Sequence, residues 1–256
     1  MRCMNRSEFK EGLLRVMERR VHWSEAAFAA GQVPRDRLHI LLEQEYASHV
    51  RDLSILLGQA YVQCPLSKAR KLLAEELYEQ ETGGLSGSDG NAELFLGLAA
   101  GLGLSTDRFR HVTLLPEAAK FHQLLMEACS RHGWEVGAAV TMVFLEGNPY
   151  ARAGLEPGVA DAPRVRPVDH PLVRFYGLPL QSLALTRVHH GRDRAQRKAA
   201  WHLMLDFVDE EARPRVLQWM GQVLHGWLHY RDELAGKIGL LPVGAPPSAG
   251  HWRDSA

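Results

Sequence analysis

The sequence predicts an all-α protein, a bundle of seven or eight helices. Apolar residues recur with the period of an amphipathic helix through most of the chain, and no segment shows the sustained alternation of a half-buried strand. Glycine and proline fall where these periodic segments stop, as they do at helix ends. At 256 residues, the chain is long enough to bury a substantial core.

The first half of the chain divides at residues that end or open helices. Gly31 stands where a glycine after a helix belongs, and Pro34 suits the first turn of the next helix. Pro65 interrupts the long apolar stripe that follows, and the stretch GGLSGSDG predicts a flexible loop. The helices predicted in this half are residues 7–30, 34–64, 67–81 and 92–101.

The second half contains longer helices and one unusual connection. Its predicted helices are residues 116–132, 134–146, 179–207 and 210–236. Residues 147–171 are rich in proline and glycine, and a connection of this length is typical of a lid, a binding loop or an insertion. We expect a single domain over residues 1–240, followed by a flexible tail over 241–256.

Charge and cysteine content narrow the classes of function. Thirty basic residues balance thirty acidic ones, which argues against nucleic acid or an anionic membrane as the main partner. The three cysteines form no CxxC pair, and no run of about 18 apolar residues occurs that could span a membrane. We therefore expect a cytoplasmic protein without disulfides.

One candidate metal site combines residues of separate predicted helices. His189 and Asp193 are four residues apart, so both side chains leave the same face of a helix. Glu81 and Glu146 each end a helical segment, and helical bundles build metal sites from inward-facing carboxylates and histidines. Solvated charges at helix ends give the same pattern. Spacing alone leaves a metal site and an ordinary charged helix both open.

Other chemistries have little support in the sequence. His225 and His229 are also four residues apart, but no HExxH arrangement accompanies them, and we interpret them as core or interface residues. The chain has no GxSxG elbow and no motif that would activate a cysteine. Its glycine-rich loop lacks the lysine of a P-loop.

Several motifs follow one another in a characteristic order. They are Cys64-Pro65, LYEQETG at 77–83, NAELFLGLAAGLGLS at 91–105, LLPEAAKF at 114–121 and FYGLPLQSLALTRVHHGRD at 175–193. In this order the chain resembles the heme-oxygenase-like superfamily over residues 9–235. This superfamily of all-α proteins contains thiaminase II-like proteins, pyrroloquinoline-quinone synthases and iron-containing diiron oxidases. The resemblance implies a heme-oxygenase-like helical bundle.

The diiron branch carries a glutamate before a glycine, a histidine that opens HxEL, a glutamate of the middle helix, and HxxxDxxH. The resemblance places four residues at ligand positions: Glu81, Glu146, His189 and Asp193. Asn91 stands in place of the first histidine, and Gln196 in place of the last. An amide oxygen is a poorer iron ligand than imidazole. We therefore expect an iron site with fewer ligands than in the diiron branch, in which both amides are free to contact the substrate.

The other branches of the superfamily match this sequence only in part. Thiaminase II-like enzymes use a cysteine of the middle helix, where this chain has AAVTMVFLE, so thiamine hydrolysis is not expected. The quinone synthases oxidise an aromatic anionic substrate with dioxygen and no metal, in a pocket rich in histidine and arginine. With the two amides, the expected substrate-binding residues are His22, Tyr46, His49, Asn91, Arg187, His190 and Gln196.

Three functions follow from these interpretations. The first is a dioxygen-using oxidoreductase that acts on a small organic substrate in bacterial secondary or cofactor metabolism, with iron at the four ligand positions. The second is a metal-free oxidase similar to the quinone synthases. The third is a small-molecule-binding or regulatory protein that has kept the fold but not the catalysis. The resemblance also implies a homodimer.

Overall fold

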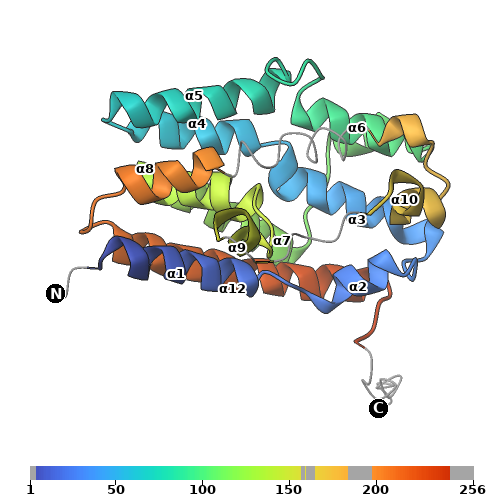
Figure 1. Ribbon diagram of the computed structural model, residues 1–256. Coiled ribbons are helices and arrows are strands. Elements are labelled where there is room, and N and C mark those ends of the chain that lie inside the picture. The colour runs from blue at the N-terminus through green and yellow to red at the C-terminus, as the bar shows by residue number, and fades with distance from the viewer. Residues whose placement is uncertain (1–3, 157–158, 160–164, 184–197, 243–256) are drawn as a thin grey trace, which may run out of the picture.

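The computed structural model describes residues 4–156, 159, 165–183 and 198–242. In these ranges all regular secondary structure is helical, and no β-strand is present (Figure 1). The all-α prediction is therefore confirmed. In the described part of the chain, no helix combines the length and apolar character that crossing a membrane would require.

Most of the helical residues belong to α-helices. These are α1 (Arg6–Glu18), α2 (Trp23–Ala29), α3 (Leu38–Glu45), α4 (Leu53–Gln63), α5 (Ser67–Thr82), α6 (Asn91–Gly101), α7 (Pro116–Arg131), α8 (Trp134–Ala138), α9 (Ala151–Leu155), α10 (Pro171–Arg174) and α12 (Arg213–Lys237). Residues 198–207 are also helical. The 3-10 helices are η1 (Arg35–Arg37), η3 (Thr106–Phe109), η5 (Pro167–Asp169) and η6 (Leu180–Ser182). Two π-helical segments, η2 (Tyr46–Val50) and η4 (Ala139–Leu145), continue α3 and α8.

Helix ends follow the proline and glycine signals of the sequence. Pro116 occupies the first turn of α7, where its missing N–H costs no hydrogen bond. Gly83 ends α5 in the left-handed conformation, with φ of 62°, and a Cβ atom there would lie 2.2 Å from the carbonyl oxygen of Asp89. Cys64 ends α4 in an extended conformation before Pro65.

Two predicted helices differ from the structure. The segment 7–30 is divided into α1 and α2, because His22 adopts an extended conformation and its side chain caps α2 by accepting a hydrogen bond from Ser24 N. The predicted helix 179–207 begins with the short 3-10 helix η6, and within the described residues only its final part, 198–207, is α-helical.

The helices pack as layers around one core. The C-terminal helix α12 packs against α1 and α7, while α4 packs against α5, α7 and α8 (Figure 1). Helices from opposite ends of the chain thus lie side by side. Fully buried side chains such as Leu57, Phe121 and Tyr230 fill the space between the layers.

The loop between α5 and α6 is fastened by a buried carboxylate. Glu79 accepts hydrogen bonds from Leu85 N at 2.7 Å, from Ser86 N at 3.1 Å and from Ser86 Oγ at 2.6 Å. Because a buried charge requires such partners, Glu79 fixes the glycine-rich loop to the end of α5.

Candidate functional site

An amide side chain joins two carboxylates in the interior between α5 and the end of η4. Gln80 Nε2 donates to Glu76 Oε1 at 2.8 Å and to Glu146 Oε2 at 3.0 Å. Glu76 and Gln80 are buried, and Glu146 is half-buried at the end of η4. Glu76 and Gln80 are one helical turn apart, so both side chains leave α5 on its inner face. We call these three residues the Glu76–Gln80–Glu146 cluster.

Glu81, which the sequence assigns as a ligand, is exposed. Successive residues of an α-helix are rotated by about 100°, so the residue after an inward-facing Gln80 turns away from Glu146. The carboxylate that α5 brings to this cluster is instead Glu76. Glu81 thus lies outside this cluster, and its assignment as a ligand stays a prediction.

Several predicted site residues lie outside the described residues. They are Arg187, His189, His190, Asp193 and Gln196. Their assignment as ligands and substrate contacts stays a prediction. Within the described residues, no group of three or more His, Cys, Asp or Glu side chains is arranged to hold a metal ion.

A second polar cluster lies between η2 and α12. Arg231 Nη1 donates to Glu45 Oε1, and the other oxygen of Glu45 lies 3.6 Å from His49 Nε2. The Tyr230 hydroxyl beside them is buried without a hydrogen bond of acceptable geometry, although Ser48 and Glu45 are its neighbours. Burial lowers the pKa of His49 and raises that of Tyr230, so both groups are favoured in their neutral forms.

Both clusters adjoin π-helical segments. In η2, Arg51 N donates to Tyr46 O at 2.9 Å, and in η4, Glu146 N donates to Thr141 O at 3.1 Å. Each bond spans five residues and inserts one extra residue into the helical turn, which changes the direction of the side chains that follow. Such segments are frequent at functional sites.

The remaining predicted substrate contacts have varied surroundings. His22 is buried, with Nδ1 at 2.7 Å from Ser24 Oγ and Nε2 at 2.9 Å from Asp232 Oδ1, so both ring nitrogens already have partners. Tyr46 is buried against the rings of Phe95 and Phe109. Asn91 is half-buried at the start of α6. His22 and Tyr46 thus have structural roles that require no ligand.

His225 and His229 are not core residues, and their alternative interpretation as interface residues stays a prediction. Their ring centroids are 4.1 Å apart, as the spacing indicates, but both residues are exposed. Within the described residues, only His229 contacts a carboxylate, with its Nδ1 at 4.0 Å from Glu117 Oε2. Neither side chain belongs to the core.

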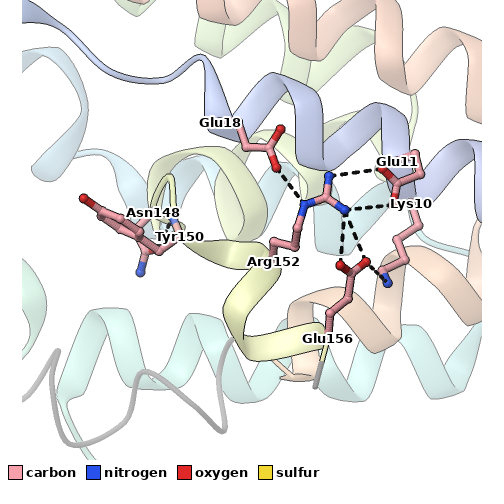
Figure 2. Close-up of polar contacts among 7 residues, drawn as sticks. All are labelled: Lys10, Glu11, Glu18, Asn148, Tyr150, Arg152 and Glu156. Atoms are coloured by element: carbon pink, nitrogen blue, oxygen red, sulfur yellow. Dashed lines mark hydrogen bonds and ion pairs between the residues drawn. The ribbon is translucent and has the colours of Figure 1, made fainter. Parts of the chain in front are cut away.

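The segment after Glu146 is held by α1 and by Arg20, which follows that helix. Arg20 Nη1 donates to the carbonyl oxygen of Gly147 at 2.9 Å. Further along, Arg152 of α9 lies between three carboxylates, at 2.8 Å from Glu18, 3.1 Å from Glu11 and 3.2 Å from Glu156 (Figure 2). The first part of the predicted lid, residues 147–156, is therefore held on the bundle.

The donor set of the Glu76–Gln80–Glu146 cluster fits a metal cation. Gln80 Oε1 is buried and has no hydrogen-bond partner, which leaves an acceptor oxygen beside two carboxylates. An orphaned buried acceptor is costly, and a cation would satisfy it. Carboxylate and amide oxygens suit divalent iron less strongly than imidazole but do bind it.

Sequence analysis missed Glu76 and Gln80, although a signal for them was present. The buried positions of α5 include Ala69, Leu73, Glu76 and Gln80, which follow one another at intervals of four, three and four residues. Two polar residues on an otherwise apolar face indicate an interior polar site. Glu45, Arg20 and Arg231 stand in sequence surroundings like those of many exposed charged residues, so the sequence does not single them out.

The fold and its interior carboxylates define an all-α protein with a buried, hydrogen-bonded polar cluster. Comparison with curated proteins gives no match. The model of a family described as iron-containing redox enzymes matches residues 39–227, which is most of the chain. The chain belongs to this family, and the predicted heme-oxygenase-like fold is confirmed.

Proposed function

We propose that this protein is an oxidoreductase that uses dioxygen to oxidise a small organic substrate, with iron bound at the Glu76–Gln80–Glu146 cluster. The observation that carries this proposal is the buried Gln80 amide, which joins two carboxylates and leaves its own oxygen without a partner. Membership in a family of iron-containing redox enzymes supports the same chemistry.

The residues that would hold iron come from both sides of the cluster. Glu76 and Glu146 supply carboxylates, and we retain His189 and Asp193 as the expected ligands from the segment outside the described residues. Iron bound there would supply electrons for the reduction of dioxygen. Asn91 and Gln196 remain the amides proposed to orient the substrate.

The chain's own groups can move protons in the second polar cluster, between η2 and α12. His49 is half-buried with a lowered pKa, so its neutral imidazole is available to accept a proton. Its Nδ1 lies 2.8 Å from Ser48 Oγ, and its Nε2 faces Glu45. We propose that these contacts orient the ring while it takes a proton from a bound substrate.

The test measures iron in protein purified after growth with added iron. We expect iron in the wild type and at least about tenfold less affinity in Glu76→Gln and Glu146→Gln, because each change removes a charged ligand. Glu81→Gln is the matched control, since the same change at an exposed position should keep the iron. Unchanged iron in both cluster variants contradicts the proposed site.

The same experiment separates the proposed function from the two alternatives. Dioxygen uptake by Fe(II)-loaded wild-type protein in the presence of ascorbate supports the iron-dependent oxidoreductase. Metal-free protein that takes up dioxygen with a substrate indicates the metal-free oxidase instead. Metal-free protein that binds small molecules without turnover indicates a binding protein.

Gln80→Glu gives a sharper prediction about the cluster. Without metal, the change removes the shared donor and leaves three carboxylates together, so we expect the free energy of unfolding to fall by about 1–3 kcal/mol. With Fe(II), the added ligand charge should raise the melting temperature more than in the wild type. Gln123→Glu adds the same charge at an exposed position and should show neither effect.

A further inference from the structure

Two exposed histidines stand one helical turn apart on the outer face of α12. The ring centroids of His225 and His229 are 4.1 Å apart, and both residues are exposed. The side chain of His229 keeps 51% of its surface open to solvent. Residues four positions apart leave a helix on the same face, one above the other. The two imidazoles therefore lie side by side on the surface of the bundle.

Neither ring has a close polar partner among the described residues. His225 contacts only the ring of His229, and His229 Nδ1 lies 4.0 Å from Glu117 Oε2, which is too far for a hydrogen bond. His22 provides a contrast, because both of its ring nitrogens have partners within 2.9 Å. The pair on α12 thus presents imidazole nitrogens that the described part of the protein does not use.

The charges beside His229 favour a cation. The Glu117 carboxylate accepts a hydrogen bond from Lys120 Nζ at 2.6 Å, and the Glu117 N–H donates to Glu233 Oε2 at 2.7 Å. Two carboxylates and one ammonium group leave one negative charge next to the ring. A cation that approaches the histidine pair is therefore attracted, and an anion is repelled.

The ligand type selects the class of cation. Imidazole nitrogen binds Zn²⁺, Cu²⁺ and Ni²⁺, whereas Mg²⁺ and Ca²⁺ prefer oxygen ligands. Two histidines four residues apart on a helix also supply zinc ligands in HExxH sites. In a tetrahedral zinc site the two nitrogens are about 3.3 Å apart, and exposed rings on successive turns can reach this separation by side-chain rotation.

We propose that His225 and His229 chelate one divalent transition-metal cation, of which Zn²⁺ is the representative. Water completes the coordination, because no group of three ligands among the described residues is arranged to hold a metal, and Glu117 is already bound to Lys120. Gly226 stands where HExxH has its glutamate, so the pair binds metal without the general base of a metalloprotease.

This surface site shares no residue with the Glu76–Gln80–Glu146 cluster and does not rest on the proposed function. A bound ion would link two successive turns of α12 in the folded state. Because the unfolded chain does not hold the two rings one turn apart, Zn²⁺ should raise the melting temperature of the protein.

The test uses the full chain without a histidine tag, stripped of metal with EDTA and titrated calorimetrically with ZnCl₂. We expect a Zn²⁺ site in the wild type that persists in Glu76→Gln and that does not respond to MgCl₂. His225→Gln and His229→Gln should each weaken this binding by at least about tenfold, because the second ring on the same helix no longer acts at high effective concentration.

Two controls separate chelation from the mere presence of histidine. His111→Gln makes the same change at an exposed histidine that has no other histidine three or four residues away, and it should bind Zn²⁺ like the wild type. His225→Gln combined with Gln222→His keeps two histidines on α12 but spaces them seven residues apart, about 10 Å along the axis. This displaced pair should bind as weakly as His225→Gln alone. All the substituted positions are exposed, and far-UV circular dichroism checks that the fold is kept.

The outcomes decide where the ion binds. Loss of binding in both single variants, but not in His111→Gln, supports the proposal, as do Cu²⁺ electron paramagnetic resonance spectra with two nitrogen ligands in the wild type and one in His229→Gln. Absence of Zn²⁺ binding by the wild type overturns the proposal, and so does wild-type affinity in His225→Gln, His229→Gln or the displaced pair. Zn²⁺ binding that both histidine variants keep and Glu76→Gln loses would assign the ion to the interior and overturn the surface site.

Discussion

His49 shows how burial sets the charge of a single residue. Burial is the main cause of its lowered pKa, and Arg20, Arg231 and His122 add to it, while Glu45 opposes it. The neutral ring of His49 is therefore favoured in the folded state. At this scale, one desolvated side chain couples folding to pH.

The sign of that coupling gives a prediction. Because the folded pKa lies below the ordinary value of 6.5, the unfolded chain binds the proton more readily, and stability is lost as the pH falls through 6.5 towards the folded value. The contribution of His49 to the slope is at most about 1.4 kcal/mol per pH unit. His49→Asn should remove this contribution to the pH dependence of the free energy of unfolding, as measured by urea unfolding between pH 5 and pH 8.

The exposed His225 provides the control for this measurement. His225→Asn should leave the pH dependence of unfolding as in the wild type. If His49→Asn also retains the full slope, other groups determine the pH dependence and the neutral state of His49 is not its cause.

Single residues of the site were only partly predictable from the sequence. Glu146 was identified because it ends an apolar segment, and the structure places it beside Gln80. Glu76, which the sequence did not single out, is buried beside Gln80, whereas Glu81 is exposed. Spacing relative to a glycine does not fix the rotation of a helix, and burial depends on contacts with other elements.

At the scale of elements, α9 is held by charge as well as by its short apolar face. Arg152 contacts Glu11 and Glu18 of α1 and Glu156 of its own segment, while Lys10 contacts Glu156 at 2.8 Å (Figure 2). A helix of five residues is too short to be stable alone. Its position therefore depends on this network.

Arg152→Gln should release this segment while leaving the bundle folded. We expect faster amide hydrogen exchange over residues 147–156 and faster chymotrypsin cleavage at Tyr150, with little change elsewhere. The control is Arg15→Gln, which removes an exposed arginine of α1 that forms no ion pair with the described residues. Equal protection of residues 147–156 in both variants would mean that apolar contacts alone hold α9.

The boundaries of elements were predictable where proline or glycine marks them, as at Pro65, Gly83 and Pro116. The π-helical segments were not, since they arise when packing forces one extra residue into a helical turn. The division of 7–30 at His22 was missed because a histidine is an uncommon cap.

At the scale of the whole molecule, the periodicity of apolar residues predicts the helices but does not predict which helices pack against each other. The packing of α1 on α12 joins the two ends of the chain, and nothing in either segment specifies the other. The order of motifs, through the resemblance to a superfamily, predicted the fold but not which helices pack together. The same limit applies to Arg20 and Arg231, which meet at Trp227 only after the bundle forms.

The prediction of one domain over residues 1–240 can be tested through α4, which packs against α5, α7, α8 and η4. Leu57 is fully buried, so Leu57→Ala should lower the free energy of unfolding by about 2–5 kcal/mol. Ile55 on the same helix is 52% exposed, and Ile55→Ala should change it by no more than about 0.5 kcal/mol. In a single cooperative unit, far-UV circular dichroism and tryptophan fluorescence should report one midpoint, shifted equally by Leu57→Ala. Two separate midpoints, of which the substitution moves only one, would show that the layers around α4 unfold as independent units.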